Sequence, residues 1–292
     1  MQSSIVKTLL LLIVFTTAFL SSIAQKQTRI IAVKEITDEP YSYPSYNRAN
    51  GNIVAQKKVG SYLQLFLLKK DAPEMQLTSD SADHKHAAIS PDGNKIAYTK
   101  LINGYSDIHL LTVNDVSDIN LTNSIHYSEA HPSWSNDSMI VFNTNQFDSL
   151  QEICSINISS KEITRLTFNK EEDTYGSVSP DGSKLVYTKW FNNEKNAEIY
   201  LLSFKDKKET RITNNEIRDV APVWLSDSVI TYSSAGGIYF YQINTSSTTK
   251  LISDQGIMLH TRGVAAGTGT LLCEQIKERR AAGLVLITYN TQ

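Results

Sequence analysis

The chain has 292 residues, of which 41% are hydrophobic, 20% are charged and 9% are aromatic. These proportions are typical of a globular protein, and they exclude a disordered or collagen-like chain. The formal net charge of −2 at pH 7 excludes the strongly basic surface expected of a nucleic-acid-binding protein.

The first 24 residues are predicted to be a secretory signal peptide. Lys7 supplies the positive charge, and residues 9–20 supply the apolar stretch. Ser22–Ala24 matches the small-x-small cleavage pattern, so we expect cleavage before Gln25. An uncleaved anchor helix is the alternative, but this stretch is short for a membrane span of about 20 residues. The mature chain, residues 25–292, is therefore expected in a periplasm or outside the cell, without a transmembrane segment.

A nine-residue segment recurs along the chain and defines a repeat. Ser90–Tyr98 returns 89 residues later as Ser179–Tyr187. Degenerate copies stand at Trp134–Phe142 and Trp224–Tyr232, and Tyr46–Val54 is a weak first copy. The two best copies contain Ser-Pro-Asp-Gly, in which Pro presets the backbone of a turn and Gly tolerates its exit geometry. Each copy therefore marks a turn between two short strands.

Two further markers follow each copy at a constant distance. The first is a short apolar strand, such as Ile108–Leu111, and the second is an apolar-Thr pair, such as Leu121–Thr122. Four short strands in a repeat of about 44 residues are the pattern of a propeller blade. The sequence therefore predicts an all-β fold, a six-bladed β-propeller of four-stranded antiparallel blades, as one domain over residues 25–292.

The two ends of the chain are expected to complete one blade together. The sixth unit starts near His260, and the chain ends at Gln292 before a fourth strand. The apolar segment Arg29–Val33 has no place in the repeats. We predict that this N-terminal strand supplies the missing outer strand of the last blade and so closes the ring.

The two cysteines are expected to stay unpaired. The repeat frame places Cys154 and Cys273 three blades apart. A disulfide needs Cα atoms within about 7 Å. We therefore interpret both residues as small buried side chains without a catalytic role.

The order of the markers resembles the repeat of the TolB propeller family. Ser-Pro-Asp-Gly-x-x-Ile-Ala-Tyr at Ser90–Tyr98 is followed by Asp107–Leu111 and Leu121–Thr122. The resemblance covers nearly the whole mature chain and identifies the blade type, not the function. It implies an exported binding platform, which in TolB contacts a peptidoglycan-associated outer-membrane partner. Only about 20 mature residues precede the first blade, so we expect a stand-alone propeller without the N-terminal domain of TolB.

The same blade type occurs in prolyl oligopeptidase-type enzymes, where a separate hydrolase domain carries the chemistry. The sequence contains no nucleophile elbow, zinc-binding helix or phosphate loop. His84 and His86 fall short of the three or four groups that usually hold a metal ion. We therefore predict no catalytic residue and no metal site.

Acidic residues recur six or seven residues before the turn serine or its equivalent, and histidines lie near them in the repeat frame. The predicted ligand-binding residues are Asp83, His86, Glu129, His131, Asp173, Asp219 and His260. Equivalent positions of a propeller repeat form a ring around the axis, so these side chains are expected at one mouth of the channel. A cleft lined by one sign of charge concentrates its field there. The alternative is that the acids cap turns by accepting backbone N–H groups.

The leading hypothesis is an exported, non-enzymatic binding propeller, monomeric, with a protein or cell-envelope partner at one face of the ring. Its rationale is the bare propeller, the signal peptide and the lack of catalytic motifs. The alternative hypothesis is a carbohydrate-active enzyme, similar to a polysaccharide lyase, that uses the histidines and carboxylates at the channel mouth. A divalent metal ion is the cofactor of that alternative.

Overall fold

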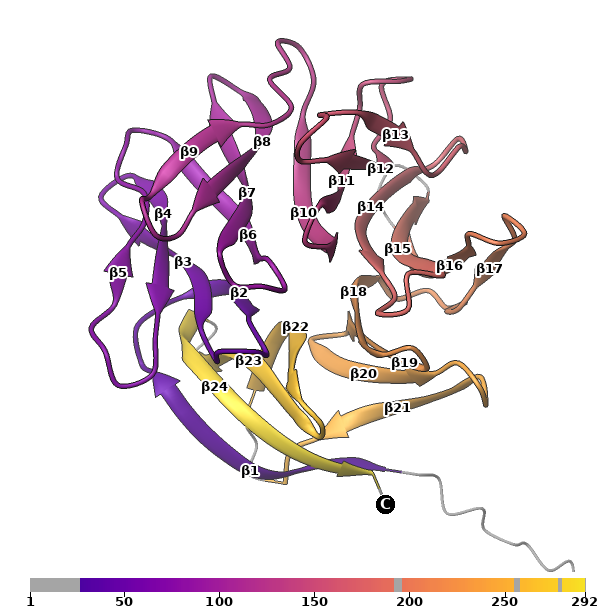
Figure 1. The fold of residues 1–292 in the computed structure, drawn as a ribbon. Coiled ribbons are helices and arrows are strands. Elements are labelled where there is room, and N and C mark those ends of the chain that lie inside the picture. Colours follow the sequence, from indigo (N-terminus) through magenta and orange to yellow (C-terminus); the bar gives the residue numbers. More distant parts are fainter. Residues whose placement is uncertain (1–26, 192–195, 255–257, 278–279, 292) are drawn as a thin grey trace, which may run out of the picture.

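The computed structural model describes residues 27–191, 196–254, 258–277 and 280–291. All regular elements in these ranges are β-strands, arranged as sheets around a central axis (Figure 1). Since these ranges contain no helix, they contain no helical segment that is long and apolar enough to cross a membrane. The expected signal peptide and its cleavage site lie outside the described residues.

Four separate sheets each consist of four consecutive antiparallel strands. The first sheet is β2 (Ser42–Tyr46), β3 (Ile53–Val59), β4 (Tyr62–Leu68) and β5 (Met75–Gln76). The second is β6 (Asp83–Ile89), β7 (Lys95–Ile102), β8 (Tyr105–Thr112) and β9 (Ser117–Asn120). The third is β10 (Glu129–Asn136), β11 (Met139–Thr144), β12 (Glu152–Asn157) and β13 (Ile163–Arg165). The fourth is β14 (Glu172–Val178), β15 (Lys184–Phe191), β16 (Asn196–Ser203) and β17 (Glu209–Arg211).

The remaining strands form one eight-stranded sheet with two halves. The first half, called the fifth sheet below, is β18 (Asp219–Ser226), β19 (Val229–Ser234), β20 (Gly237–Gln242) and β21 (Ser247–Ile252). The second half is β22 (Met258–Gly267), β23 (Thr270–Lys277), β24 (Arg280–Thr291) and β1 (Thr28–Thr37). The innermost strands of all these units, β2, β6, β10, β14, β18 and β22, surround the axis (Figure 1).

The first and last strands of the chain lie side by side. β1 pairs with β24 in antiparallel register from Thr28 opposite Thr291 to Thr37 opposite Leu284. This is the neighbour that the sequence predicts for Arg29–Val33. The amino end of β1 also pairs in parallel with Leu251 and Ile252 of β21. The last two units therefore share one sheet, because β1 is long enough to reach the outer edge of β21. The sequence does not predict this shared sheet.

The Ser-Pro-Asp-Gly turns are held by their own side chains. Ser90 Oγ donates to Asp92 Oδ1 over 2.6 Å and accepts the N–H of Lys95 over 2.9 Å. Gly93 closes the turn with φ of +77°, a backbone region that favours glycine. The copy at Ser179 makes the same contacts with Asp181 and Lys184.

The degenerate copies bond to the turns of the preceding sheets. Asp137 Oδ1 of the third sheet accepts the N–H of Asp92 over 3.0 Å, and Asp227 of the fifth sheet likewise accepts that of Asp181 over 2.8 Å. The indole N–H groups of Trp134 and Trp224 donate to backbone carbonyls of the preceding sheets, each over 2.9 Å. The two sequence variants of the turn therefore act as complementary partners.

The hydrophobic core lies between neighbouring sheets. Val54 and Leu65 of the first sheet pack with Ile96 and Tyr98 of the second in one buried cluster. Equivalent clusters fill the later interfaces, since a sheet with two apolar faces must bury both against neighbours.

The two cysteines lie far apart in this arrangement. Cys154 in β12 and Cys273 in β23 are both buried and unpaired, as the sequence predicts. Burial raises the pKa of the Cys154 thiol to about 12 and raises the pKa of Cys273 as well. Neither thiol is therefore activated as a nucleophile.

Deleting residues 28–36 removes most of β1 and exposes the backbone edge of β24. We expect the free energy of unfolding to fall by several kcal/mol, which lowers the melting temperature by roughly 10 °C or more. Differential scanning calorimetry of the deletion and of Ile31→Ser, a change at an exposed side chain of the same strand, measures the difference. A deletion that melts within about 2 °C of the wild type contradicts the prediction.

Candidate functional site

The two ends of the ring differ in their loops. β6 begins at Asp83, which pairs with Leu101 beside the β7–β8 hairpin. The third, fourth and fifth sheets repeat this register. The loops that lead into the innermost strands therefore lie at the same end as the hairpins between second and third strands. We call this end the hairpin face, and we call the opposite end, which carries the Ser-Pro-Asp-Gly turns, the funnel face.

A β-bulge interrupts the innermost strand of each of the first five sheets. One residue in each bulge has φ between +49° and +57°; these are Tyr43, His86, His131, Tyr175 and Ala221. Bulky side chains rarely adopt this backbone conformation. Since Ala221 adopts it too, the bulge itself does not require an aromatic ring.

The first four bulge residues form a stack of rings that we call the collar. The ring centroids are 4.8 Å apart for Tyr43 and His86, 4.1 Å for His86 and His131, and 4.0 Å for His131 and Tyr175. Their strands surround the axis (Figure 1). The collar therefore follows the wall of the channel over four consecutive sheets, and it brings together two of the predicted site residues.

A chain of side-chain amides orients His131. Its Nδ1 lies 3.0 Å from Asn143 Oδ1, and Asn143 Nδ2 donates to Gln151 Oε1 over 2.5 Å. Gln151 Nε2 donates to the carbonyl of Ser128 over 3.4 Å. Because a carbonyl only accepts, this direction of donation makes Nδ1 of His131 the donor in its contact with Asn143. The imidazole is thus held in one orientation with its Nδ1 protonated.

Three of the four predicted acids share one position, two residues before the bulge residue. Glu129, Asp173 and Asp219 are each at most 1% exposed. Asn169 and Asn215 donate to Asp173 and Asp219 over 2.5 and 2.7 Å, and Ser124 Oγ donates to Glu129 over 3.0 Å. The structure therefore places these carboxyl groups among the loops between sheets. In these contacts the donors are side-chain amides and a hydroxyl, not the backbone N–H groups that a turn cap would accept.

Another carboxylate, at the start of the third strand, lies near two of these buried acids. It explains why an apolar-Thr pair recurs in the sequence, because the threonine hydroxyl of each pair bonds to it. Thr167 Oγ1 donates to Glu152 and accepts the N–H of Ile153 over 2.9 Å. Thr213 makes the same pair of contacts, with Glu198 and Ile199. Burial raises the pKa of Asp173 to about 8, and the charge of Glu152 adds to the effect. Burial also raises the pKa of Glu129 to about 7.

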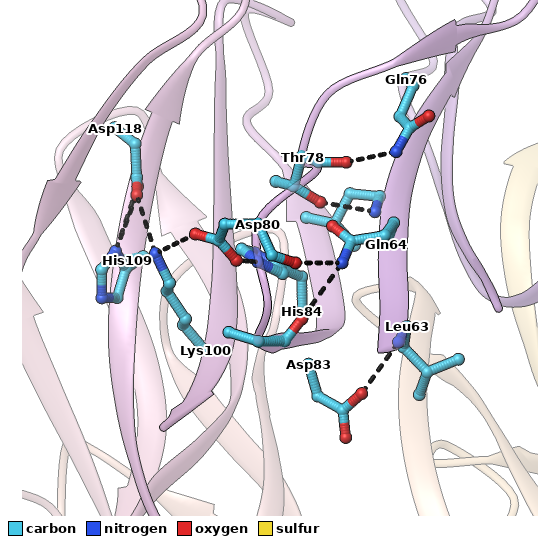
Figure 2. Close-up of polar contacts among 12 residues, drawn as sticks. Leu63, Gln64, Gln76, Thr78, Asp80, Asp83, His84, Lys100, His109 and Asp118 are labelled. Atoms are coloured by element: carbon cyan, nitrogen blue, oxygen red, sulfur yellow. Dashed lines mark hydrogen bonds and ion pairs between the residues drawn. The ribbon is translucent and has the colours of Figure 1, made fainter. Parts of the chain in front are cut away.

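The second sheet departs from this pattern. His84, not Asp83, stands two residues before its bulge residue, and it is 1% exposed. Figure 2 shows its Nε2 beside Asp80 Oδ1, at 2.7 Å, and Lys100 Nζ at 2.8 Å from the other oxygen of Asp80. Burial lowers the pKa of His84, and the carboxylate of Asp80 opposes that shift.

Asp83 lies three residues before the bulge residue of its strand, one residue earlier than the buried acids of the other sheets. Its Oδ1 accepts the N–H of Leu63 from the first sheet over 2.8 Å (Figure 2). Its Oδ2 lies 3.0 Å from Lys85 Nζ. Asp83 therefore ties the second sheet to the first. The predicted residue His260 lies in β22, and its side chain is outside the described part of the structure.

A metal ion has no evident ligand set in the ranges that the structure describes. No three His, Cys, Asp or Glu side chains converge there closely enough to hold one. No chemical step is therefore assigned to a metal ion.

Tyr43, Tyr175 and the amides that orient His131 are not among the site residues predicted from the sequence. A signal for part of the collar is present, because His86, His131 and Tyr175 each lie four residues before the turn serine or its equivalent. The relay from Asn143 to Gln151 has no such signal, since its members meet only through strand pairing.

Large hydrophobic side chains gather on the hairpin face. The described residues include thirteen exposed large hydrophobics, and nine of these lie in its hairpins and loops. The nine are Val59, Tyr62, Ile102, Tyr105, Ile125, Tyr127, Phe147, Phe168 and Ile217. The guanidinium of Arg165 lies 5.4 Å from the ring of Phe147 and 4.9 Å from that of Phe168, which links two of the loops.

Four-stranded sheets arranged around a channel define the class of β-propeller proteins. A family model described as the tricorn protease N-terminal beta propeller domain matches residues 65–268. This match covers more than half of the chain. The chain therefore belongs to this family of β-propellers, of the TolB type that the repeat motifs indicate.

Known relatives agree with this assignment. The Tol-Pal system protein TolB of Francisella tularensis is 25% identical over 190 residues, which cover 60% of this chain and 43% of the relative. The chain thus matches less than half the length of that protein. The crystal structure of TolB from Acinetobacter baumannii has a TM-score of 0.63 at 15% identity, covering 77% of this chain and 56% of that one.

An enzyme shares the fold as well. A solved oligogalacturonate lyase in complex with manganese has a TM-score of 0.53 at 11% identity, covering 91% of this chain and 96% of that one. Likeness at this level of identity shows the fold alone.

The raised pKa values of Glu129 and Asp173 predict a stability that falls with increasing pH. Each carboxyl keeps its proton in the folded chain up to about pH 7 or 8, whereas in the unfolded chain it ionises near pH 4. Between these limits the folded state binds more protons, so the free energy of unfolding decreases as pH rises. We expect a loss on the order of a few kcal/mol between pH 5 and pH 8.5.

Chemical denaturation of the wild type and of the Glu129→Gln, Asp173→Asn variant at both pH values measures this loss. The variant should lose most of the dependence, which separates these two carboxyls from His84, whose lowered pKa acts in the opposite direction. Glu162→Gln, at an exposed turn residue, is the control. A slope that is unchanged in the double variant contradicts the prediction.

Proposed function

We propose that this chain is an exported, non-enzymatic binding propeller of the cell envelope that engages a protein partner through its hairpin face. In this proposal residues 25–292 form one domain with six blades, and β1 closes the ring as the outer strand of the last blade. The pairing of β1 with β24 supports this arrangement. The proposal places the monomeric mature chain in a periplasm or outside the cell.

The concentration of exposed apolar side chains on the hairpin face carries the proposal. Only four of the thirteen exposed large hydrophobics among the described residues lie elsewhere: Ile31, Met75, Val116 and Ile119. Contiguous apolar surface on one face is typical of a protein-binding site. If these apolar side chains were only the occasional exposed residues that every protein has, they would be distributed over both faces and the rim.

The exposed apolar side chains of the hairpin face are spread over several loops, which favours a partner with a broad surface. Phe168 and Ile125 are 72% and 77% exposed, and they stand on loops that lead into the fourth and third sheets. Tyr105 contacts His126 with ring centroids 6.2 Å apart, which extends the surface toward the second sheet. A partner that covers these loops spans several sheets, so a folded domain fits better than a short peptide.

Affinity capture from a matching envelope fraction tests this proposal. The test variant is Ile125→Ser, Phe168→Ser, Ile217→Ser, and the matched control is Ile31→Ser, Met75→Ser, Ile119→Ser, with three exposed hydrophobics from elsewhere. We expect a partner that the wild type and the control retain and that the test variant retains roughly tenfold less, a loss of about 1.4 kcal/mol. Equal retention by all three proteins, or by none, contradicts the proposal.

A carbohydrate-active enzyme, similar to a polysaccharide lyase, is the second candidate. The orientation of His131 by Asn143 favours it, because a base for proton abstraction needs a defined orientation. The likeness to the oligogalacturonate lyase structure is consistent with it but shows only the fold. A divalent metal ion belongs to this candidate, although the described residues offer no ligand set for one.

Turnover of acidic oligosaccharides separates the two candidates. An enzyme should lose at least about a hundredfold in rate on His131→Ala, the range expected for removal of a general base. Glu162→Gln, at an exposed turn residue outside the collar and its neighbours, should retain the rate. Absence of turnover across a broad panel of polysaccharides would eliminate the enzyme and leave the binding propeller.

A further inference from the structure

A cavity of about 760 Å³ opens at the funnel face. Its wall consists of the second halves of the innermost strands and the turns that follow them. At one level the wall residues are Tyr46, Ile89, Trp134, Val178 and Trp224. The strands reach this wall directly after the collar residues, so the collar lies at the inner end of the cavity. We call this cavity the funnel.

Polar groups of the wall are already bonded to neighbouring sheets. The indole N–H groups of Trp134 and Trp224 donate to the carbonyls of Ala88 and Ser177. Ser133 Oγ donates to the carbonyl of Gly176 over 2.7 Å, and Ser45 Oγ accepts the N–H of Ile89 over 3.0 Å. The wall therefore offers somewhat more apolar than polar surface to a ligand, and several of its polar groups are already occupied by bonds within the protein.

Arg48 extends over the rim of the funnel from the turn between β2 and β3. Its Nη2 donates to the carbonyl of Leu225 over 3.2 Å, and its Nε donates to that of Ala265 over 3.3 Å. These two contacts hold the guanidinium between the first sheet and the last two innermost strands. The side chain is thus positioned, although the residue is exposed.

Arg48 forms no ion pair in the described part of the chain. Asp137 is the acid that lines the same cavity, and it accepts the N–H of Asp92. The funnel therefore carries one guanidinium and one carboxylate on its lining, and the guanidinium of Arg48 is the one without an ion-pair partner or an acidic neighbour bonded to it among the described residues.

We propose that the funnel binds a carboxylate carried on an apolar body, such as a medium-chain fatty acid or the apolar carboxyl terminus of a peptide. A guanidinium pairs well with a carboxylate. The apolar body gains by leaving water for the wall of Trp, Pro and Val side chains. This site is independent of the proposed function, because it lies at the opposite end of the ring from the hairpin face.

Titration of the mature chain with octanoate and with octanol tests the charge requirement. Calorimetry and tryptophan fluorescence report binding, since two of the three tryptophans line the funnel. We expect octanoate to bind at least tenfold more tightly than octanol. Equal affinities, or no binding of either compound up to its solubility limit, would overturn the proposal.

Two variants test the site. Arg48→Gln should weaken octanoate binding at least tenfold and leave octanol binding unchanged, whereas Lys208→Gln, at an exposed turn, should change neither. Arg48→Lys keeps the charge and should keep the preference for octanoate, even if it melts at a lower temperature. Ala88→Phe fills the funnel and should abolish the binding of both compounds. Octanoate binding that survives both Arg48→Gln and Ala88→Phe lies elsewhere and contradicts the assignment.

A third comparison distinguishes the two sources of the carboxylate. The probes are the tripeptide Val-Leu-Leu with a free carboxyl terminus and the same tripeptide with an amidated one. Tighter binding of the free peptide than of octanoate assigns the funnel to a polypeptide end, and the reverse order assigns it to a fatty acid. A peptide acid that binds no better than its amide, with octanoate no better than octanol, overturns carboxylate recognition.

Discussion

The bulge in each innermost strand is the constraint on which the centre of this propeller depends. An innermost strand has a neighbour on one edge only, and its other edge faces the channel. The bulge turns one residue out of the ladder with φ near +55°. Its side chain then meets those of the adjacent sheets, as the ring contacts of the collar show. The bulge positions thus separate the loops of the hairpin face from the funnel.

The contacts between sheets explain why the best copies of the repeat are two units apart. The second and fourth sheets carry Ser-Pro-Asp-Gly turns; the third and fifth carry an aspartate that bonds to each turn and a tryptophan that bonds to a carbonyl of the strand before it. An N–H group in a turn and a carbonyl in the preceding strand that lack partners need a neighbour with the matching acceptor and donor. The apparent degeneracy of the third and fifth copies is therefore a different structural role, and their side chains cannot be exchanged independently.

The two ends of the ring offer different chemistry to ligands. The hairpin face exposes apolar side chains on separate loops, which suits a wide protein surface. The funnel face encloses a cavity with aromatic and aliphatic groups on its wall and the guanidinium of Arg48 at its rim, which suits a small amphiphilic ligand. Between them, His131 is the imidazole with a defined orientation. The buried acids do not join either surface, because loop side chains already hold them.

The repeats of this sequence determined the strand content, the turn positions and the N-terminal strand beside the last one, because these depend on local backbone preference and a regular period. They also showed that Glu129, Asp173 and Asp219 are equivalent, but not that these acids are buried. The tertiary structure alone decided that His84 replaces Asp83 in this frame and that Tyr43 and Tyr175 join His86 and His131. It also decided that Arg48 reaches β18 and β22, which lie far from it in the sequence. The reason is physical: a period places residues along a strand, whereas a bulge shifts the register and the arrangement of sheets around an axis brings together side chains that lie far apart in the chain.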